Sequence, residues 1–171
     1  MDFSELAKSR YSVRAFSDRK IEDDKLQTIL EAARVAPTAC NNQPQRLYVL
    51  KSDEAIKTLE SVTKFVFGAK TVVIFTSVKE EEWKNPFTKD YHTGEIDVSI
   101  ACTQAMLQAW ELGIGSCWVG YFDPEKVRKA FSIPKTEQIV AILPLGYPAD
   151  NAKPALGHFS RKPLEETVKY L

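Results

Sequence analysis

The sequence predicts an α+β domain, in which helices pack against a sheet. Two observations lead to this fold class. Helical and strand patterns alternate along the 171 residues, and two apolar runs, at 72–75 and 139–143, have the composition of buried strands. Hydrophobic residues make up 44% of the chain, which is enough to build one core in a unit of this size. We therefore expect residues 1–171 to form a single domain.

Three shorter helices are predicted from apolar spacing and from capping residues. Residues 22–35 carry apolar side chains at i, i+3, i+4 and i+7, and Pro37 stops the pattern. Residues 53–63 have a similar helical pattern. Asp123 followed by proline is a typical N-cap and first helical position, so a further helix is expected over 123–131.

The strongest helix signal runs from Asp97 to about Leu112, where Gly113 ends it. Its apolar residues nearly encircle the helix, so we expect it to be buried on most sides. One small subunit cannot easily cover so many apolar faces. The long helix is therefore a candidate for a subunit interface.

Strands are expected at 46–51, 72–75 and 139–143, the last closed by Pro144. Residues 80–95 are polar and irregular, which predicts a long surface segment. The last twenty residues contain few apolar side chains. Such a tail has little core of its own, and we expect it to dock on another surface, such as a second subunit.

Composition excludes several classes of function. Lys+Arg and Asp+Glu both number 23, so the zero net charge gives no support for a nucleic-acid partner. No stretch approaches the roughly 20 apolar residues of a membrane span, and the polar N-terminus does not resemble a secretory signal. Three cysteines and two histidines predict reduced thiols and no metal site. We expect a cytoplasmic location without a membrane partner.

Familiar catalytic motifs are missing from the sequence. The chain contains no G-x-x-x-x-G-K-[ST], G-x-G-x-x-G, G-x-S-x-G, H-E-x-x-H or C-x-x-C pattern. We find no catalytic nucleophile, acid or base to name. Three other segments remain as candidates for a binding site.

The first segment alternates Arg10, Ser12 and Arg14. In an extended conformation these side chains point to one side, and two guanidinium groups with a hydroxyl suit a phosphate. The alternative is a solvated edge strand with spare charge.

The second segment, at 36–44, is rich in amide side chains and contains prolines at both ends. Amides offer donors and acceptors together, which suits a heterocycle with alternating N–H and C=O groups. An ordinary turn explains the same composition.

The third segment, at 113–123, combines glycines with Trp118 and leads into the helix at Asp123. Small residues let the backbone approach a flat ligand. A helix-to-strand connection with glycine caps is the alternative, and spacing does not separate the two.

Taken together and in order, these segments resemble the nitroreductase-like flavoprotein family. An Arg-x-Ser-x-Arg segment precedes a helix that ends in Ala-x-x-Ala-Pro-Thr, and Asn-x-Gln-Pro follows. A long helix then leads into Gly-x-Gly-x-x-Trp, followed by Phe-Asp-Pro, a strand ending in Pro-Leu-Gly-Tyr-Pro, and a late arginine, Arg161. The resemblance covers nearly the whole chain. Many family members carry Trp after Gln-Pro, where this chain has Gln45, and the chain lacks room for the inserted helices of larger members.

The resemblance implies a mostly antiparallel sheet flanked by helices, in an intertwined homodimer with FMN between the subunits. Arg10, Ser12 and Arg14 would hold the phosphate and ribityl end, helped by Arg161. Pro37, Thr38 and Ala39 would line the flavin ring from the other subunit, and Asn41 would contact the ring or ribityl chain. Trp118, Val119 and Gly120 would cover the opposite region, with a backbone N–H of Gly120 or Tyr121 near flavin N5. Tyr11 and Gln43 complete the cofactor-binding residues.

The implied activity is that of an FMN-dependent NAD(P)H oxidoreductase. A hydride from NADH or NADPH would pass through flavin N5 to a flat acceptor, such as a nitroaromatic or a quinone, in a ping-pong sequence. Two alternatives remain open. One is a specialised enzyme of the same fold, for reductive dehalogenation or flavin remodelling. The other is a flavin-binding protein without turnover.

Overall fold

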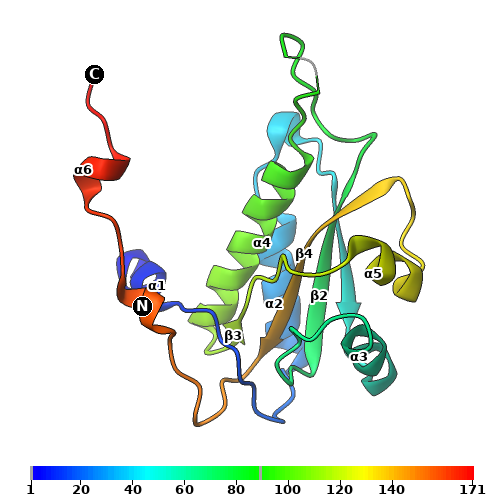
Figure 1. Cartoon of the computed structure of the whole chain (residues 1–171), viewed down its shortest axis with the longest axis vertical. Coiled ribbons are helices and arrows are strands. Elements are labelled where there is room, and N and C mark those ends of the chain that lie inside the picture. Colours follow the sequence, from blue (N-terminus) through cyan, green and yellow to red (C-terminus); the bar gives the residue numbers. More distant parts are fainter. Residues whose placement is uncertain (1, 89) are drawn as a thin grey trace.

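A four-stranded antiparallel sheet forms the centre of the computed structural model, which describes residues 2–88 and 90–171 (Figure 1). The strand order is β1-β2-β4-β3, with the antiparallel pairs β1–β2, β2–β4 and β4–β3. The strands are β1 (Gln45–Leu50), β2 (Thr71–Val78), β3 (Gly115–Ser116) and β4 (Glu137–Gly146). The predicted α+β class and antiparallel sheet are confirmed.

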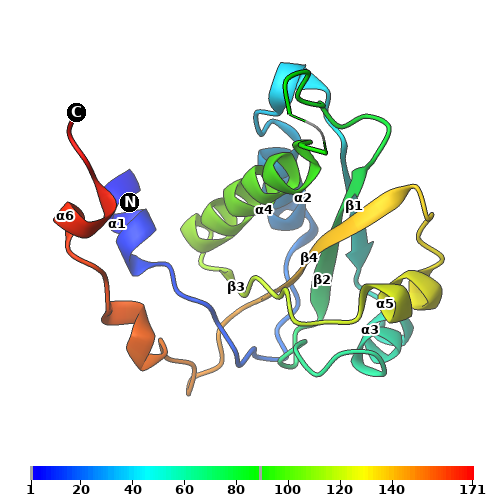
Figure 2. The same ribbon diagram turned by 45° about the horizontal axis from the view of Figure 1, so that its top comes forward.

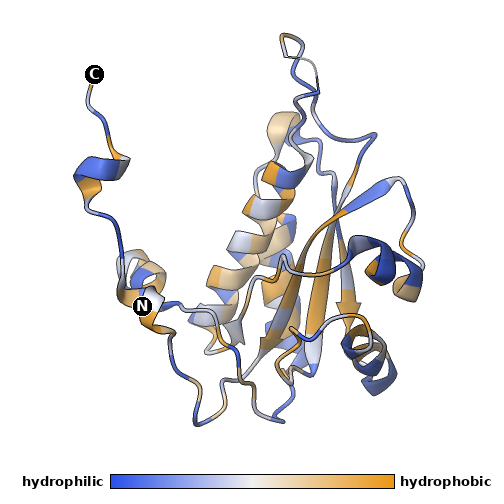
Figure 3. Cartoon of the chain, in the orientation of Figure 1, coloured by the Kyte–Doolittle hydropathy of each residue, from blue (hydrophilic) through white to orange (hydrophobic). Residues whose placement is uncertain are grey.

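Two pairs of helices cover the two faces of the sheet (Figure 2). One face carries α2 (Asp23–Arg34) and α4 (Gly94–Glu111), and the other carries α3 (Asp53–Glu60) and α5 (Pro124–Phe131). Side chains that alternate along β2 divide between two cores. Val73 and Phe75 pack with α2 and α4, whereas Val72 and Ile74 pack with α3 and α5. Figure 3 shows the apolar strands enclosed between these helices.

The long helix differs from its prediction in two respects. It begins at Gly94, one turn before Asp97, and a Cβ atom at Gly94 would lie 2.0 Å from the buried carboxylate of Glu82. Within one chain the helix is also not buried on most sides. Ile96 is 46% exposed and Ile100 is 37% exposed, so an apolar stripe of α4 has no cover from its own subunit.

Several other boundaries also differ from the sequence prediction. β4 continues through Pro144 to Gly146, because this proline still offers its carbonyl oxygen, which accepts the Cys117 N–H at 3.3 Å. β2 is longer than the predicted run at 72–75, and α3 ends at Glu60. The 80–95 segment contains no helix or strand before Gly94 among the described residues.

The N-terminal helix and the start of the C-terminal tail lie near the C-terminal end of α4, and the rest of the tail extends away from the body (Figure 1). The N-terminal helix is α1 (Phe3–Ser9), and the tail contains η2 (Leu156–Phe159) and α6 (Leu164–Thr167). None of the residues in these three helices is buried. The tail exposes five large apolar side chains: Leu156, Phe159, Leu164, Tyr170 and Leu171. No helix in the described part of the chain combines the length and apolar character that crossing a membrane requires.

Candidate functional site

The segment that contains the two predicted phosphate arginines runs extended beside β3. Ser12 forms a parallel bridge with Ser116, and the Val13 N–H donates to the Ser116 carbonyl at 2.9 Å. Val13 is fully buried, and a Cβ atom at Gly115 would lie 2.6 Å from its Cγ2 atom. Because neighbouring side chains in extended backbone alternate, burial of Val13 directs Ser12 and Arg14 the other way.

The three predicted phosphate-binding side chains gather around the Cys117 thiol. Burial raises the pKa of this thiol, whereas Arg14, a hydrogen bond from Ser12, and Arg10 all lower it. The backbone bridge between Ser12 and Ser116 agrees with this, because it brings the Arg10–Arg14 segment alongside the residue that precedes Cys117. Within residues 2–88 and 90–171, neither arginine forms an ion pair with a carboxylate. The structure therefore concentrates two uncompensated positive charges at one place.

The segment after Cys117 exposes backbone donors three and four residues farther along the chain. Val119 is buried, and its N–H and carbonyl pair with Ile142 at 2.9 and 3.1 Å. Its side chain therefore packs in the core beside α3 and α5. In contrast, the backbone N–H groups of Gly120 and Tyr121 have no partner in the part of the chain that the structure describes. Unpaired N–H groups in this position are suited to donate to a ligand.

A groove of about 700 Å³ opens beside these two N–H groups. One wall is the segment 60–65 after α3, and the other is the segment 120–123 before α5. The rings of Phe65 and Tyr121 meet edge to face, with their centroids 5.3 Å apart, and Tyr121 is 81% exposed. The groove thus has an aromatic wall of the kind that takes flat ligands.

The amide-rich segment forms the short helix η1 (Ala39–Asn41), with unusual backbone geometry. Cys40, Asn41 and Gln43 have positive φ angles of 52°, 56° and 53°. A non-glycine residue in this region costs roughly 1–2 kcal/mol. Strain of this kind persists where surrounding contacts fix the backbone, and it is concentrated at functional sites.

Hydrogen bonds within the segment fold it back toward Thr38. The Thr38 carbonyl accepts the Asn41 N–H at 3.0 Å, and the Thr38 hydroxyl oxygen accepts the Gln43 N–H at 3.0 Å. The Gln43 side-chain amide donates to the Asn41 carbonyl at 3.2 Å. Gln43 therefore shapes the loop, while Pro37 and Asn41 are exposed and available to a ligand.

One subunit does not bring its two groups of predicted residues together. The η1 loop contacts the first turn of α4, through Asp97. The Arg10–Arg14 segment contacts the last turn, where the rings of Tyr11 and Trp110 lie 5.1 Å apart. These positions on α4 are separated by roughly 20 Å, at a rise of 1.5 Å per residue. Figure 1 shows the two segments at opposite ends of the helix.

Among the described residues, Arg161 forms no hydrogen bond with the other predicted phosphate-binding residues. Its guanidinium donates to carbonyl oxygens of its own tail, those of Gly157, His158 and Ser160. The tail itself passes close by, since the ring of His158 lies 6.2 Å from that of Tyr11. The predicted role of Arg161 stays a prediction.

Sequence reasoning missed three features of this region. The segment 60–65 was expected only as the end of a helix, and its contribution to the groove depends on tertiary contacts with Tyr121. Ser116 is buried, and its hydroxyl oxygen has no hydrogen-bond partner within the described residues. Asp97 and Thr93 resemble an ordinary helix start in the sequence, although the Asp97 carboxylate accepts the Ala39 N–H of the η1 loop and the Thr93 hydroxyl donates to that carboxylate.

Comparison with known proteins identifies the family. The model of the Nitroreductase family matches residues 7–65 and 61–147. The chain belongs to this family. This match confirms the resemblance that the sequence motifs indicated, and it covers both the Arg10–Arg14 segment and the residues of the groove.

Individual relatives agree with the family match. A putative NADH dehydrogenase/NAD(P)H nitroreductase of Archaeoglobus fulgidus is 32% identical over 152 residues, which is 83% of each chain. The crystal structure of a nitroreductase family protein from Clostridium difficile 630 has a TM-score of 0.92 and 40% identity, and the match covers 99% of this chain and 98% of that one. An FMN-dependent nitroreductase from Clostridium difficile R20291 has a TM-score of 0.75 and 26% identity, with 90% and 91% covered.

The residues present fit the phosphate end of FMN. Two arginines without carboxylate partners and the Ser12 hydroxyl supply the charge and the donors that a phosphate requires. The orphaned Ser116 hydroxyl, on the strand that pairs with Ser12, is a further polar group without a partner. Buried polar groups in native proteins are almost always satisfied, so an unpaired one beside such a cradle is consistent with a ligand.

Proposed function

We propose that this member of the Nitroreductase family is an FMN-dependent NAD(P)H oxidoreductase that reduces a flat acceptor, such as a nitroaromatic or a quinone. The observation that carries the proposal is that the segment of Arg10, Ser12 and Arg14 bridges to Ser116, on the same stretch of chain as the Gly120 and Tyr121 N–H groups, which have no partner among the described residues. The names of the Archaeoglobus and Clostridium relatives support the same chemistry. When bound, FMN would supply hydride transfer at its N5 atom.

The residues of this chain would bind and orient rather than transfer protons. Arg10, Ser12 and Arg14 would hold the phosphate, with Arg161 as a further partner. A backbone N–H of Gly120 or Tyr121 would donate toward N5 and draw electron density from it, which favours acceptance of a hydride there. Trp118 is half-buried at the start of this segment and would cover the ring.

The groove beside Tyr121 would admit the nicotinamide and the acceptor in turn. Its volume of about 700 Å³ lies in the usual range for small-molecule sites, and its aromatic wall suits flat rings. Because one groove would serve both substrates, the oxidised nicotinamide must leave before the acceptor enters. This requires ping-pong kinetics.

We further propose that the working form is a homodimer in which each subunit completes the site of the other. The η1 loop and the Arg10–Arg14 segment lie at opposite ends of α4, so Pro37, Thr38, Ala39 and Asn41 would reach the flavin of the partner. The exposed stripe at Ile96 and Ile100, with the apolar tail, provides a surface for the second copy. A stable, flavin-loaded monomer in sedimentation at low micromolar concentration would contradict this arrangement.

The test of function begins with the purified protein. We expect a yellow protein from which FMN, and not FAD, is released, and steady-state oxidation of NADH or NADPH with parallel double-reciprocal lines when the acceptor is varied. Protein that stays colourless after incubation with FMN would refute the cofactor. Intersecting lines together with a ternary complex would refute the shared groove.

Two other functions predict different results in the same assays. A specialised enzyme for dehalogenation or flavin remodelling would bind FMN yet reduce no nitroaromatic, quinone or free flavin. A non-catalytic flavin-binding protein would bind FMN and oxidise no nicotinamide at all. A cytoplasmic location stays a prediction.

A further inference from the structure

Asp97 is a buried carboxylate that binds the η1 loop. It lies in the first turn of α4 and is 2% exposed. Its Oδ1 atom accepts the Ala39 N–H at 3.0 Å, and its Oδ2 atom accepts the Thr93 hydroxyl at 2.7 Å. Among residues 2–88 and 90–171 it has no ion-pair partner.

A buried charge without a cation needs other compensation. The positive end of the α4 dipole favours a negative group in the first turn, and both carboxylate oxygens have donors. An apolar residue could fill the same space and would need no compensating charge or donors. However, it would leave the Ala39 N–H without its acceptor. The carboxylate is therefore best explained by the loop that it holds.

The loop needs an external anchor because its own hydrogen bonds do not fix it to the body. They join residues 38–43 to one another, whereas three residues of the loop adopt positive φ angles that an unconstrained chain would leave. The Ala39 N–H lies at the start of η1, immediately before the strained residue Cys40. A hydrogen bond at this point ties the strained turn to the rigid 18-residue helix.

We infer that Asp97 is a positioning residue for the cofactor. Through the Ala39 N–H, its carboxylate holds residues 37–41 in the shape that contacts the flavin of the partner subunit. Thr93 supports it by orienting the second carboxylate oxygen. This inference rests on the proposed function, because the loop is assigned to the flavin there.

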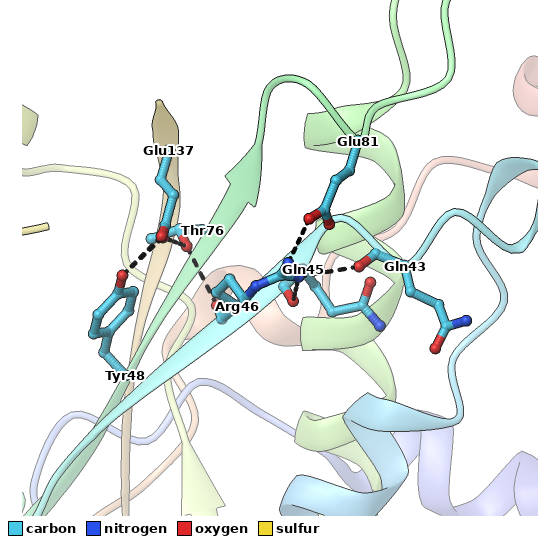
Figure 4. A network of polar contacts seen from close by, with 7 residues as sticks. All are labelled: Gln43, Gln45, Arg46, Tyr48, Thr76, Glu81 and Glu137. Atoms are coloured by element: carbon cyan, nitrogen blue, oxygen red, sulfur yellow. Dashed lines mark hydrogen bonds and ion pairs between the residues drawn. The ribbon is translucent and has the colours of Figure 1, made fainter. Parts of the chain in front are cut away.

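The chain offers a matched control in Glu137 of β4. This carboxylate is also buried, at 7% exposed, and it also accepts hydroxyl groups, from Tyr48 at 2.9 Å and from Thr76 at 2.5 Å. Figure 4 shows its hydrogen bonds to Tyr48 and Thr76, and within the described residues its carboxylate has no hydrogen bond to the η1 loop. Arg46 links this part of the sheet indirectly to the η1 loop, because its guanidinium donates to the Gln43 carbonyl at 3.2 Å. Loss of either carboxylate should therefore destabilise the fold. Only the loss of Asp97 should also release the η1 loop.

The experiment compares Asp97→Ala, Asp97→Asn and Glu137→Ala with the native protein. In the flavin-free protein, hydrogen exchange of the peptide that contains Ala39 reports the loop directly, and thermal unfolding reports stability. In the FMN-loaded protein, the dissociation constant and the visible circular dichroism of the flavin report its environment. Thr93→Val removes the hydroxyl that donates to Asp97, which is one of the two contacts of the carboxylate. This variant replaces Asp97→Ala in the experiment if Asp97→Ala does not fold.

We expect Asp97→Ala to raise the exchange rate at Ala39 and the FMN dissociation constant by about tenfold each, and to change the flavin dichroism. In Asp97→Asn, the exchange rate at Ala39 and the FMN dissociation constant should stay within about threefold of the native values. The new amide can accept the Ala39 N–H and donate to the Thr93 oxygen. Thr93→Val should shift the same readouts in the same direction by less. Glu137→Ala should lower the unfolding temperature and leave exchange at Ala39, FMN affinity and dichroism unchanged.

Two results would overturn the inference. One is equal loss of FMN affinity in Asp97→Ala and Glu137→Ala, which would reduce Asp97 to a general contributor to stability. The other is a protected Ala39 N–H in Asp97→Ala. If the native protein binds no FMN, the proposed function fails, while the exchange measurement still decides whether Asp97 holds the loop.

Discussion

The two ends of α4 fix their neighbouring segments by different means. At the N-terminal end, the η1 loop is strained and tied to the buried carboxylate of Asp97. At the C-terminal end, the extended segment around Ser12 is held by a backbone bridge to β3, and its two arginines form no ion pair within residues 2–88 and 90–171. The first end thus presents a rigid, mostly uncharged surface, and the second presents free positive charge.

In the proposed homodimer, this difference would divide one binding site between two copies of the chain. A flat ring requires a surface of fixed shape, which the strained loop provides. A phosphate requires charge and donors, which the unpaired arginines provide. Because the two ends are roughly 20 Å apart on a rigid helix, each copy can offer its ring surface to one cofactor and its charge to the other. Three experiments test this comparison.

The largest effect is expected at the charged end. Replacing Arg14 by Ala removes a charge-assisted contact of roughly 1.5–3 kcal/mol to the phosphate. The FMN dissociation constant should rise roughly 10- to 150-fold, as measured by flavin fluorescence, while the fold survives. Lys51→Ala, which removes one positive charge from an exposed pair with Asp23, is the control and should bind FMN normally.

The outcome for Arg10 completes this test. If Arg14→Ala keeps full affinity and Arg10→Ala unfolds the protein, the segment has a structural role and the charged end is not a phosphate site.

A smaller effect follows from mixing variants of the two ends. Arg14→Ala and Asn41→Ala each damage both sites of their own homodimer. A mixed dimer carries both lesions in one site and none in the other, so unfolding and refolding an equal mixture should restore roughly a quarter of the native sites. Flavin titration, at a concentration that fills native sites only, measures this fraction. No recovery would mean that both residues serve the same subunit's flavin.

The smallest effect concerns acid sensitivity near the charged end. Ser17 donates to the Tyr147 carbonyl at 2.9 Å, and the Tyr147 hydroxyl donates to Glu22 at 2.6 Å. Hydrogen bonds from Tyr147 and then Arg19 lower the pKa of Glu22 to about 2. Since the folded pKa lies below the unfolded value of 4.5, Glu22 contributes stability above that value and loses it as the pH falls toward 2.

The measurement is thermal unfolding of the native protein and Glu22→Gln between pH 7 and pH 2. The native protein should be the more stable at pH 7, and the difference should vanish at the acid end. Asp150→Asn, at an exposed turn outside the helices and without an ion pair in the described chain, is the control for loss of a surface carboxylate. A constant difference across the range would show that Glu22 acts through packing and not through its charge.

Local patterns determined much of this protein. The apolar spacing at 22–35, the Asp123 cap and the buried runs at 72–75 and 139–143 are local signals, and each produced the expected element. The order of weak motifs was sufficient for the family. The alternation of Arg10, Ser12 and Arg14 predicted a shared face, because extended backbone fixes side-chain direction without reference to the rest of the fold.

Tertiary structure alone decided the rest, because it depends on contacts between residues far apart in the chain. Asp97 looks like any acidic residue at a helix start until Ala39, 58 positions away, is placed against it. The groove at Tyr121 exists because the segment 60–65 lies opposite. The separation of the Arg10–Arg14 segment from the η1 loop follows from the length of α4 between them. Spacing along the sequence carries no information on such distances, since these arise only when the helices pack on the sheet.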